Sequence, residues 1–66
     1  MDEIKIAELS DTIWIYTPYN HRFIEAIKTH LAARWDPMSK CWVVAKRFAD
    51  DVRKIMIDIY GKDDKG

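Results

Sequence analysis

The 66-residue sequence has one cysteine, two glycines and two prolines, and it has no long apolar run. A single cysteine, Cys41, excludes an intrachain disulfide and a zinc site built from several thiolates. His21 and His30 lie nine positions apart, which is not a ligand spacing. No apolar stretch approaches the ~20 residues of a membrane span, and the acidic amino terminus does not resemble a secretory signal. We therefore expect a cytoplasmic chain without cofactor, metal or membrane contact.

The chain is short, so residues 1–66 are expected to form a single domain. A core of this size supplies only about 3–5 kcal/mol. With 48% hydrophobic residues, including three Trp, three Tyr and two Phe, dense packing or a homodimer can make up the difference. We expect an ordered core over about 3–61 and a solvated tail over 62–66.

The net charge is zero, but the charges are unevenly distributed. Residues 1–20 carry −3, residues 21–54 carry +4 and residues 55–66 carry −1. A mildly basic middle permits contact with nucleic acid, although it is weaker than the basic stripe of a dedicated binder. The charged residues of the first segment are Asp2, Glu3, Lys5, Glu8 and Asp11.

The first half of the chain has the pattern of a hairpin followed by a helix. Residues 3–9 alternate apolar and polar side chains, and residues 12–17 are β-branched or aromatic throughout. The gap at Ser10-Asp11 is too short for a crossover, so these strands pair antiparallel. The next helix covers His21–Leu31, with Phe23, Ile27 and Leu31 on one stripe. It begins either at Thr17, with Pro18 in the first turn, or at an Asn20 cap.

The second half repeats that pattern. Trp35 and Trp42 flank the Asp36–Ser39 turn, and Cys41–Val44 forms the fourth strand. A final helix runs over about Arg47–Tyr60 and ends at Gly61. The expected fold is therefore a small α+β domain of order β-β-α-β-β-α, with a four-stranded antiparallel sheet and both helices on one face.

Two helices cover only one face of a sheet, and residues 12–17 are apolar on both faces. If Ile13 and Ile15 lie under the helices, Trp14 and Tyr16 lie on the open face, where they need a partner. That partner is a second copy of the chain, another protein, or single-stranded nucleic acid whose bases stack on aromatic rings. The alternative is that the tryptophans complete a small core.

Basic residues near the hairpins and helix starts are candidates for phosphate contacts, which give salt-dependent binding. The alternative is an ordinary solvated surface. His21 and His30 lie about 13 Å apart along their helix and form no catalytic pair, so we expect no enzyme activity. The candidate site residues are Trp14, Tyr16, Arg22, Arg34, Trp35, Lys40, Trp42, Lys46 and Arg47.

The stretch Ala33-Arg34-Trp35-Asp36-x-x-x-Lys40-x-Trp42-x-Val44 resembles the G-A-[RK]-W-D…K-x-W-x-[VF]-P signature. This signature occurs in small HARP-like domains of annealing helicases, primases and mobile-element proteins. The preceding Tyr16–Asn20 segment is also similar to that family. The chain departs from the signature where Ala32 replaces Gly and Ala45 replaces Pro.

The resemblance implies a link to DNA processing and a phage or mobile-element origin, with a host cytoplasm as the place of action. The first hypothesis is a small non-enzymatic nucleic-acid-binding module that prefers single strands to duplex. The second is an accessory factor or inhibitor, acting as a dimer, that binds a host protein through the open sheet face.

Overall fold

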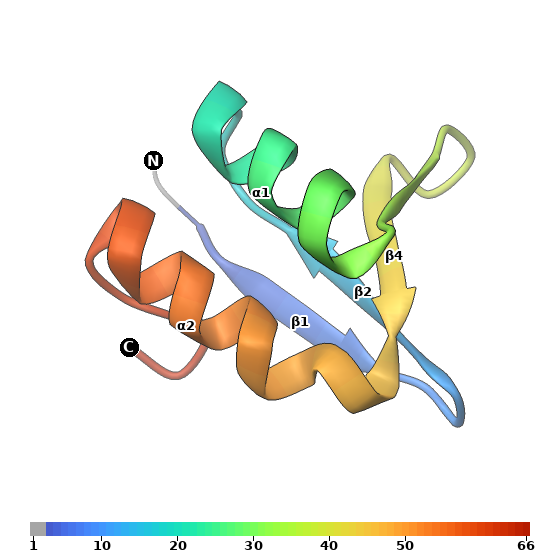
Figure 1. Cartoon of the computed structure of the whole chain (residues 1–66). Helices are drawn as coiled ribbons and strands as arrows, with labels where there is room; N and C mark the ends of the chain where they lie inside the picture. Colours follow the sequence, from blue (N-terminus) through green and yellow to red (C-terminus); the bar gives the residue numbers. More distant parts are fainter. Residues whose placement is uncertain (1–2) are drawn as a thin grey trace.

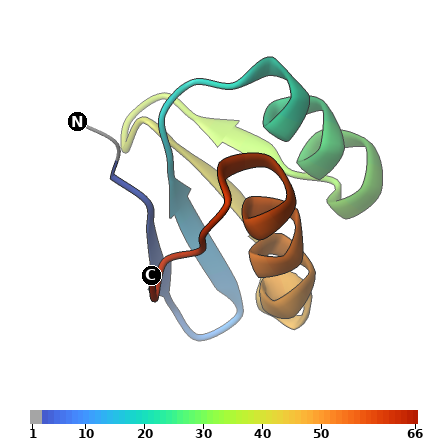
Figure 2. The ribbon, with the colours of Figure 1, turned by 90° about the vertical axis from the view of Figure 1, so that its left-hand side faces the viewer.

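The computed structural model of this chain describes residues 3–66, so Met1 and the acidic Asp2 lie outside the described residues. The element order is the expected β-β-α-β-β-α in one compact α+β domain. Figure 1 shows the sheet running behind the two helices, and Figure 2 shows both helices on one side of it. The elements are β1 (Lys5–Glu8), β2 (Thr12–Tyr16), α1 (His21–Leu31), β3 (Arg34–Asp36), β4 (Cys41–Ala45), the 3₁₀ turn η1 (Lys46–Phe48) and α2 (Ala49–Tyr60).

The four strands form one antiparallel sheet in the order β1-β2-β4-β3. The two hairpins therefore meet at the centre, where β2 pairs with β4. The register sets Ile13 opposite Val44 and Trp14 opposite Val43. Because directly opposed residues share a face, Trp14 and Val43 lie on the face that the helices leave open, as the alternation of β2 predicts.

The tryptophans of the β3-β4 hairpin lie on the opposite face of the sheet from Trp14. Trp35 is opposite Trp42, and Trp42 is opposite Ile15, so all three lie on the helix side of the sheet. Arg34 is opposite Val43 and shares the open face with it. The sequence left this register undecided, since a shift of one residue exchanges the faces.

Local chemistry fixes both ends of α1. The side chain of Asn20 accepts a hydrogen bond of 3.1 Å from the backbone N–H of Phe23, so Asn20 is the cap and the Thr17 alternative is wrong. At the other end, Ala32 takes a left-handed conformation with φ 53°, and the Ile27 carbonyl accepts from the N–H groups of Ala32 and Ala33. Ala32 thus adopts the left-handed conformation that glycine commonly takes at the end of a helix.

The last helix starts later than expected. A 3₁₀ turn, Lys46–Phe48, precedes α2, which begins at Ala49 instead of Arg47. The first turn of α2 carries Asp50 and Asp51, which favour the positive end of the helix dipole. Gly61 ends the helix at φ 81°, as predicted.

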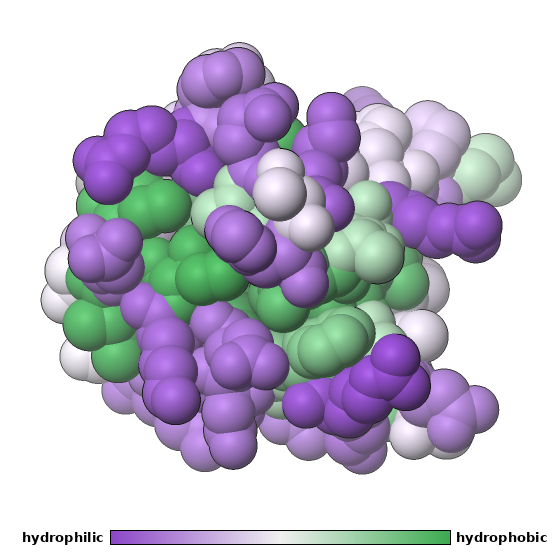
Figure 3. Space-filling view, in the orientation of Figure 1, coloured by the Kyte–Doolittle hydropathy of each residue, from purple (hydrophilic) through white to green (hydrophobic). Residues whose placement is uncertain are grey.

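The core lies between the sheet and the helices, where the helical stripes meet the inner face of β2 and β4. Figure 3 shows apolar surface in green between α1 and α2, so the two helices do not seal this layer completely. The buried cluster consists of Ile4, Ile13, Ile15, Phe23, Ile27, Leu31, Val44, Val52 and Met56.

The carboxyl-terminal tail is tied to the domain. Arg53 on α2 donates to both Asp64, at 2.9 Å, and Glu8, at 3.0 Å. The Asp64 side chain is only 12% exposed, so this part of the 62–66 segment packs against the helix and the end of β1.

Candidate functional site

A pocket of about 400 Å³ lies beside the second hairpin. It opens where the end of β2, the start of α1 and the β3-β4 hairpin approach one another. Four aromatic residues line it, two of them exposed, and Lys40 supplies the charge. The lining residues are Ile15, Tyr16, Thr17, Pro18, Tyr19, Ile24, Trp35, Lys40 and Trp42.

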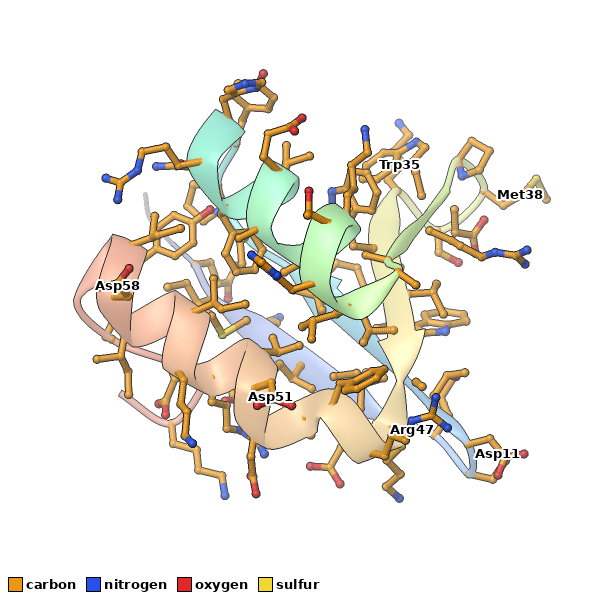
Figure 4. The ribbon with its side chains drawn as sticks, viewed as in Figure 1. Asp11, Trp35, Met38, Arg47, Asp51 and Asp58 are labelled. Atoms are coloured by element: carbon orange, nitrogen blue, oxygen red, sulfur yellow. The ribbon has the colours of Figure 1, made fainter. Side chains whose placement is uncertain are left out.

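Trp35 and Trp42 form the wall on the hairpin side. Their ring centroids are 5.3 Å apart at an interplanar angle of 62°, an edge-to-face arrangement. Trp42 packs against the core, whereas Trp35 remains 50% exposed on the outermost strand. In Figure 4, Trp35 lies at the upper end of β4, and Met38 projects beyond it from the hairpin turn.

The opposite wall comes from the strand-to-helix connection. Tyr19 is 81% exposed at the rim, just before the Asn20 cap. Pro18 is held in place because the hydroxyl of Tyr60 donates a 2.7 Å hydrogen bond to its carbonyl. Burial raises the pKa of Tyr60, so the hydroxyl keeps its proton for this bond at neutral pH.

Lys40 enters the pocket from an unusual backbone position. It has φ 55°, and it ends a turn in which Asp36 accepts a 3.0 Å hydrogen bond from the N–H of Met38. Left-handed backbone costs a residue with a Cβ roughly 1–2 kcal/mol, so the turn alone favours glycine here. The lysine side chain at this position is thus not explained by turn chemistry.

The structure brings together four of the nine predicted site residues: Tyr16, Trp35, Lys40 and Trp42. Trp14 and Arg34 belong to the open face of the sheet instead. Arg22 is exposed in the first turn of α1 but does not line the pocket.

The remaining two predicted residues lie at the far end of β4. Figure 4 shows Arg47 at the base of the sheet near Asp11, away from Trp35. The guanidinium of Arg47 lies 4.9 Å from the ring centre of Phe48, and Lys46 lies 4.0 Å from Glu8. Both cations therefore have partners within the domain.

The other five lining residues were not among the predicted site residues: Ile15, Thr17, Pro18, Tyr19 and Ile24. The position of Tyr19 could have indicated a place in the pocket, because this aromatic residue lies between the end of a strand and a helix cap. The position of Ile24 was less informative, since it lies beside the buried stripe of α1 and not on it.

Cys41 is buried on the open-face side of β4, next to Tyr16. Burial raises the pKa of its thiol, and so does the nearby Asp36 carboxylate, although a hydrogen bond with Tyr16 acts in the opposite direction. The thiol is therefore protonated at neutral pH, and a protonated thiol is a poor nucleophile.

Within residues 3–66, no group of three or more His, Cys, Asp and Glu side chains gathers to hold a metal. No helix among these residues is long and apolar enough to cross a membrane. Comparisons with protein-family models, curated proteins and solved structures find no significant match to this chain. The fold and the pocket therefore define a small α+β domain with a pocket lined largely by aromatic residues.

Proposed function

We propose that this chain is a small, non-enzymatic nucleic-acid-binding module of phage or mobile-element type, acting in a host cytoplasm. The observation that carries the proposal is the pocket that the exposed aromatic residues Trp35 and Tyr19 line together with the positively charged Lys40. Bases of single strands stack on such rings while cations meet the phosphates. The similarity of residues 33–44 to HARP-like motifs also supports nucleic-acid binding.

The test is a titration of fluorescein-labelled single-stranded DNA, single-stranded RNA and duplex DNA with the protein, followed by anisotropy at low and moderate salt. We expect single strands to bind more tightly than duplex, with affinity falling as salt rises. Trp35→Ala should weaken binding. Met38→Ala is the matched control, because Met38 is apolar and 91% exposed on the same hairpin but does not line the pocket. Absence of binding to all three probes at low salt would contradict the proposal.

A second candidate function is a protein-binding accessory factor or inhibitor that uses the open sheet face, with a homodimer as its simplest form. Its specific support is that Trp14 and Val43 lie side by side on the face without helices, with Arg34 next to them. Light scattering tests the dimer: we expect Trp14→Lys to convert a dimer into a folded monomer. A wild-type monomer at micromolar concentration would count against this candidate.

A further inference from the structure

We propose that the pocket takes one unpaired nucleotide, with its base against Trp35 and its flanking phosphates at Lys40 and Lys28. The protein would thus recognise a single exposed base and would not follow a long strand. This inference rests on the proposed nucleic-acid function and deepens it by defining the ligand as one nucleotide unit.

The size and walls of the pocket favour a single base. Its volume, about 400 Å³, is near the lower end of the ~300–1,000 Å³ range of small-molecule sites. Both highly exposed aromatic residues of this region, Trp35 and Tyr19, border the same pocket. A base that enters from solvent meets the exposed half of Trp35, whose other contact is the edge-to-face packing on Trp42.

The positive charges around the pocket also indicate a binding site for a single nucleotide. Lys40 is part of the lining. Lys28 follows the lining residue Ile24 by four positions on α1, so its side chain neighbours Ile24 on the same helix face. Within the described residues, neither lysine forms an ion pair, whereas Lys46 approaches Glu8. Lys40 in the lining and Lys28 one helical turn beyond Ile24 are the two cations that we assign to the two phosphates flanking one nucleotide.

Three of the other candidate aromatic and basic residues lie away from this pocket. Trp14 and Arg34 lie on the opposite face of the sheet. Arg47 lies at the other end of β4 and stacks on Phe48. A strand that continued past the pocket would therefore not meet Trp14, Arg34 or Arg47.

An unpaired base is required because a paired base is stacked between its neighbours and exposes only its edge. The ligand chemistry is thus a nucleobase with a phosphate on each side, as found in a single strand, a bulge or a chain end. The pocket contains few polar groups, so stacking should dominate over recognition of base edges.

The experiment measures binding of thymidine 3′,5′-bisphosphate and of oligothymidylates of three, six and twelve nucleotides, by quenching of tryptophan fluorescence. We expect the bisphosphate to bind, and the intrinsic affinity per site to stop rising at about three nucleotides. The plot of log K against log salt should have a slope of about −1.4, because each neutralised phosphate of a single strand contributes about −0.7. Affinity that keeps rising to twelve nucleotides, with a slope steeper than about −4, would overturn the inference but leave the proposed function intact. No binding by any oligonucleotide would overturn both.

Single substitutions can distinguish a loss of binding at this pocket from a loss of folding stability. Lys40→Gly should reduce the salt slope by about 0.7 and weaken binding several-fold, while the protein becomes more stable because glycine accepts positive φ. Arg34→Gln is the matched loss of charge, on the same hairpin but the opposite face, and it should leave both affinity and slope unchanged. Trp35→Ala should weaken binding about tenfold, and Trp35→Phe should restore most of it. An equal loss in Arg34→Gln and Lys40→Gly would refute the assignment.

Discussion

Trp35 and Trp42 are cross-strand partners whose rings meet edge to face at 5.3 Å, but they have different surroundings. Trp42 lies on β4, between β3 and β2, and packs against the buried cluster. Trp35 lies on the edge strand and exposes half of its surface. Trp42 is therefore the structural member of this pair, and Trp35 is the member whose ring is accessible to a ligand.

This difference predicts unequal effects on stability. Trp42→Ala removes an indole that contacts the core, and we expect it to cost about 2–3 kcal/mol, less than the ~3–5 kcal/mol of a fully buried aromatic. Trp35→Ala should cost only about 0.5–1 kcal/mol, close to the value of an aromatic pair. Urea unfolding followed by circular dichroism measures both. Similar losses in the two variants would show that the pair acts as one structural unit.

The pocket wall formed by Pro18 depends on a single hydroxyl. Tyr60 donates to the Pro18 carbonyl at 2.7 Å, and its ring packs 5.3 Å from that of Phe23. Tyr60→Phe keeps the ring contact and removes the hydrogen bond, so we expect a loss of about 1 kcal/mol in the free energy of unfolding. Tyr19→Phe removes a hydroxyl from a residue that is 81% exposed and should cost almost nothing. A similar loss in both variants would contradict this role for Tyr60.

The backbone at the end of α1 gives a prediction of opposite sign. Ala32 adopts φ 53°, which is costly for a residue with a Cβ. Ala32→Gly should therefore stabilise the protein by about 1 kcal/mol. The control is Ala26→Gly in the middle of the same helix, where glycine should destabilise by about 1 kcal/mol. A thermal melt distinguishes the two signs, and a lower melting temperature for Ala32→Gly would show that the left-handed turn carries no strain.

Much of the fold follows from sequence periodicity, but the site does not. The alternation of Ile13 and Ile15 with Trp14 indicated which side of β2 is open, and the spacing of Phe23, Ile27 and Leu31 indicated the buried face of α1. In both cases a strict period of two or 3.6 residues ties the sequence to one face. The element order could therefore be predicted in full.

The pocket could not be predicted because it depends on how segments distant in sequence approach each other. Trp35 and Trp42 have no preferred face in sequence, since a one-residue shift of the hairpin exchanges it. Lys40 and Tyr19 are 21 positions apart and meet only when β4 pairs with β2. The contact between Arg53 and Asp64 likewise joins residues whose pairing no local pattern specifies.

That contact predicts a dependence of stability on pH. The hydrogen bond from Arg53 holds the pKa of Asp64 below its ordinary value, although partial burial acts in the opposite direction. A carboxyl whose pKa is lower in the folded state stabilises the fold above its unfolded pKa, and it loses that effect as pH falls through the folded value. The contribution should therefore be complete at pH 7 and should decline as pH falls below about 4.

Asp64→Asn tests this by removing the charge while keeping the shape. At pH 7 we expect a loss of about 1 kcal/mol, because Asp64 itself is largely buried but the exposed Glu8 and Asp50 open the cluster to screening by solvent. The difference between variant and wild type should shrink in urea titrations between pH 5 and pH 2, as the wild-type carboxylate gains a proton. Asp58→Asn is the control, since Figure 4 shows Asp58 on α2 pointing away from the domain. A constant difference across this pH range would mean that Asp64 stabilises the tail through its neutral hydrogen bonds and not through its charge.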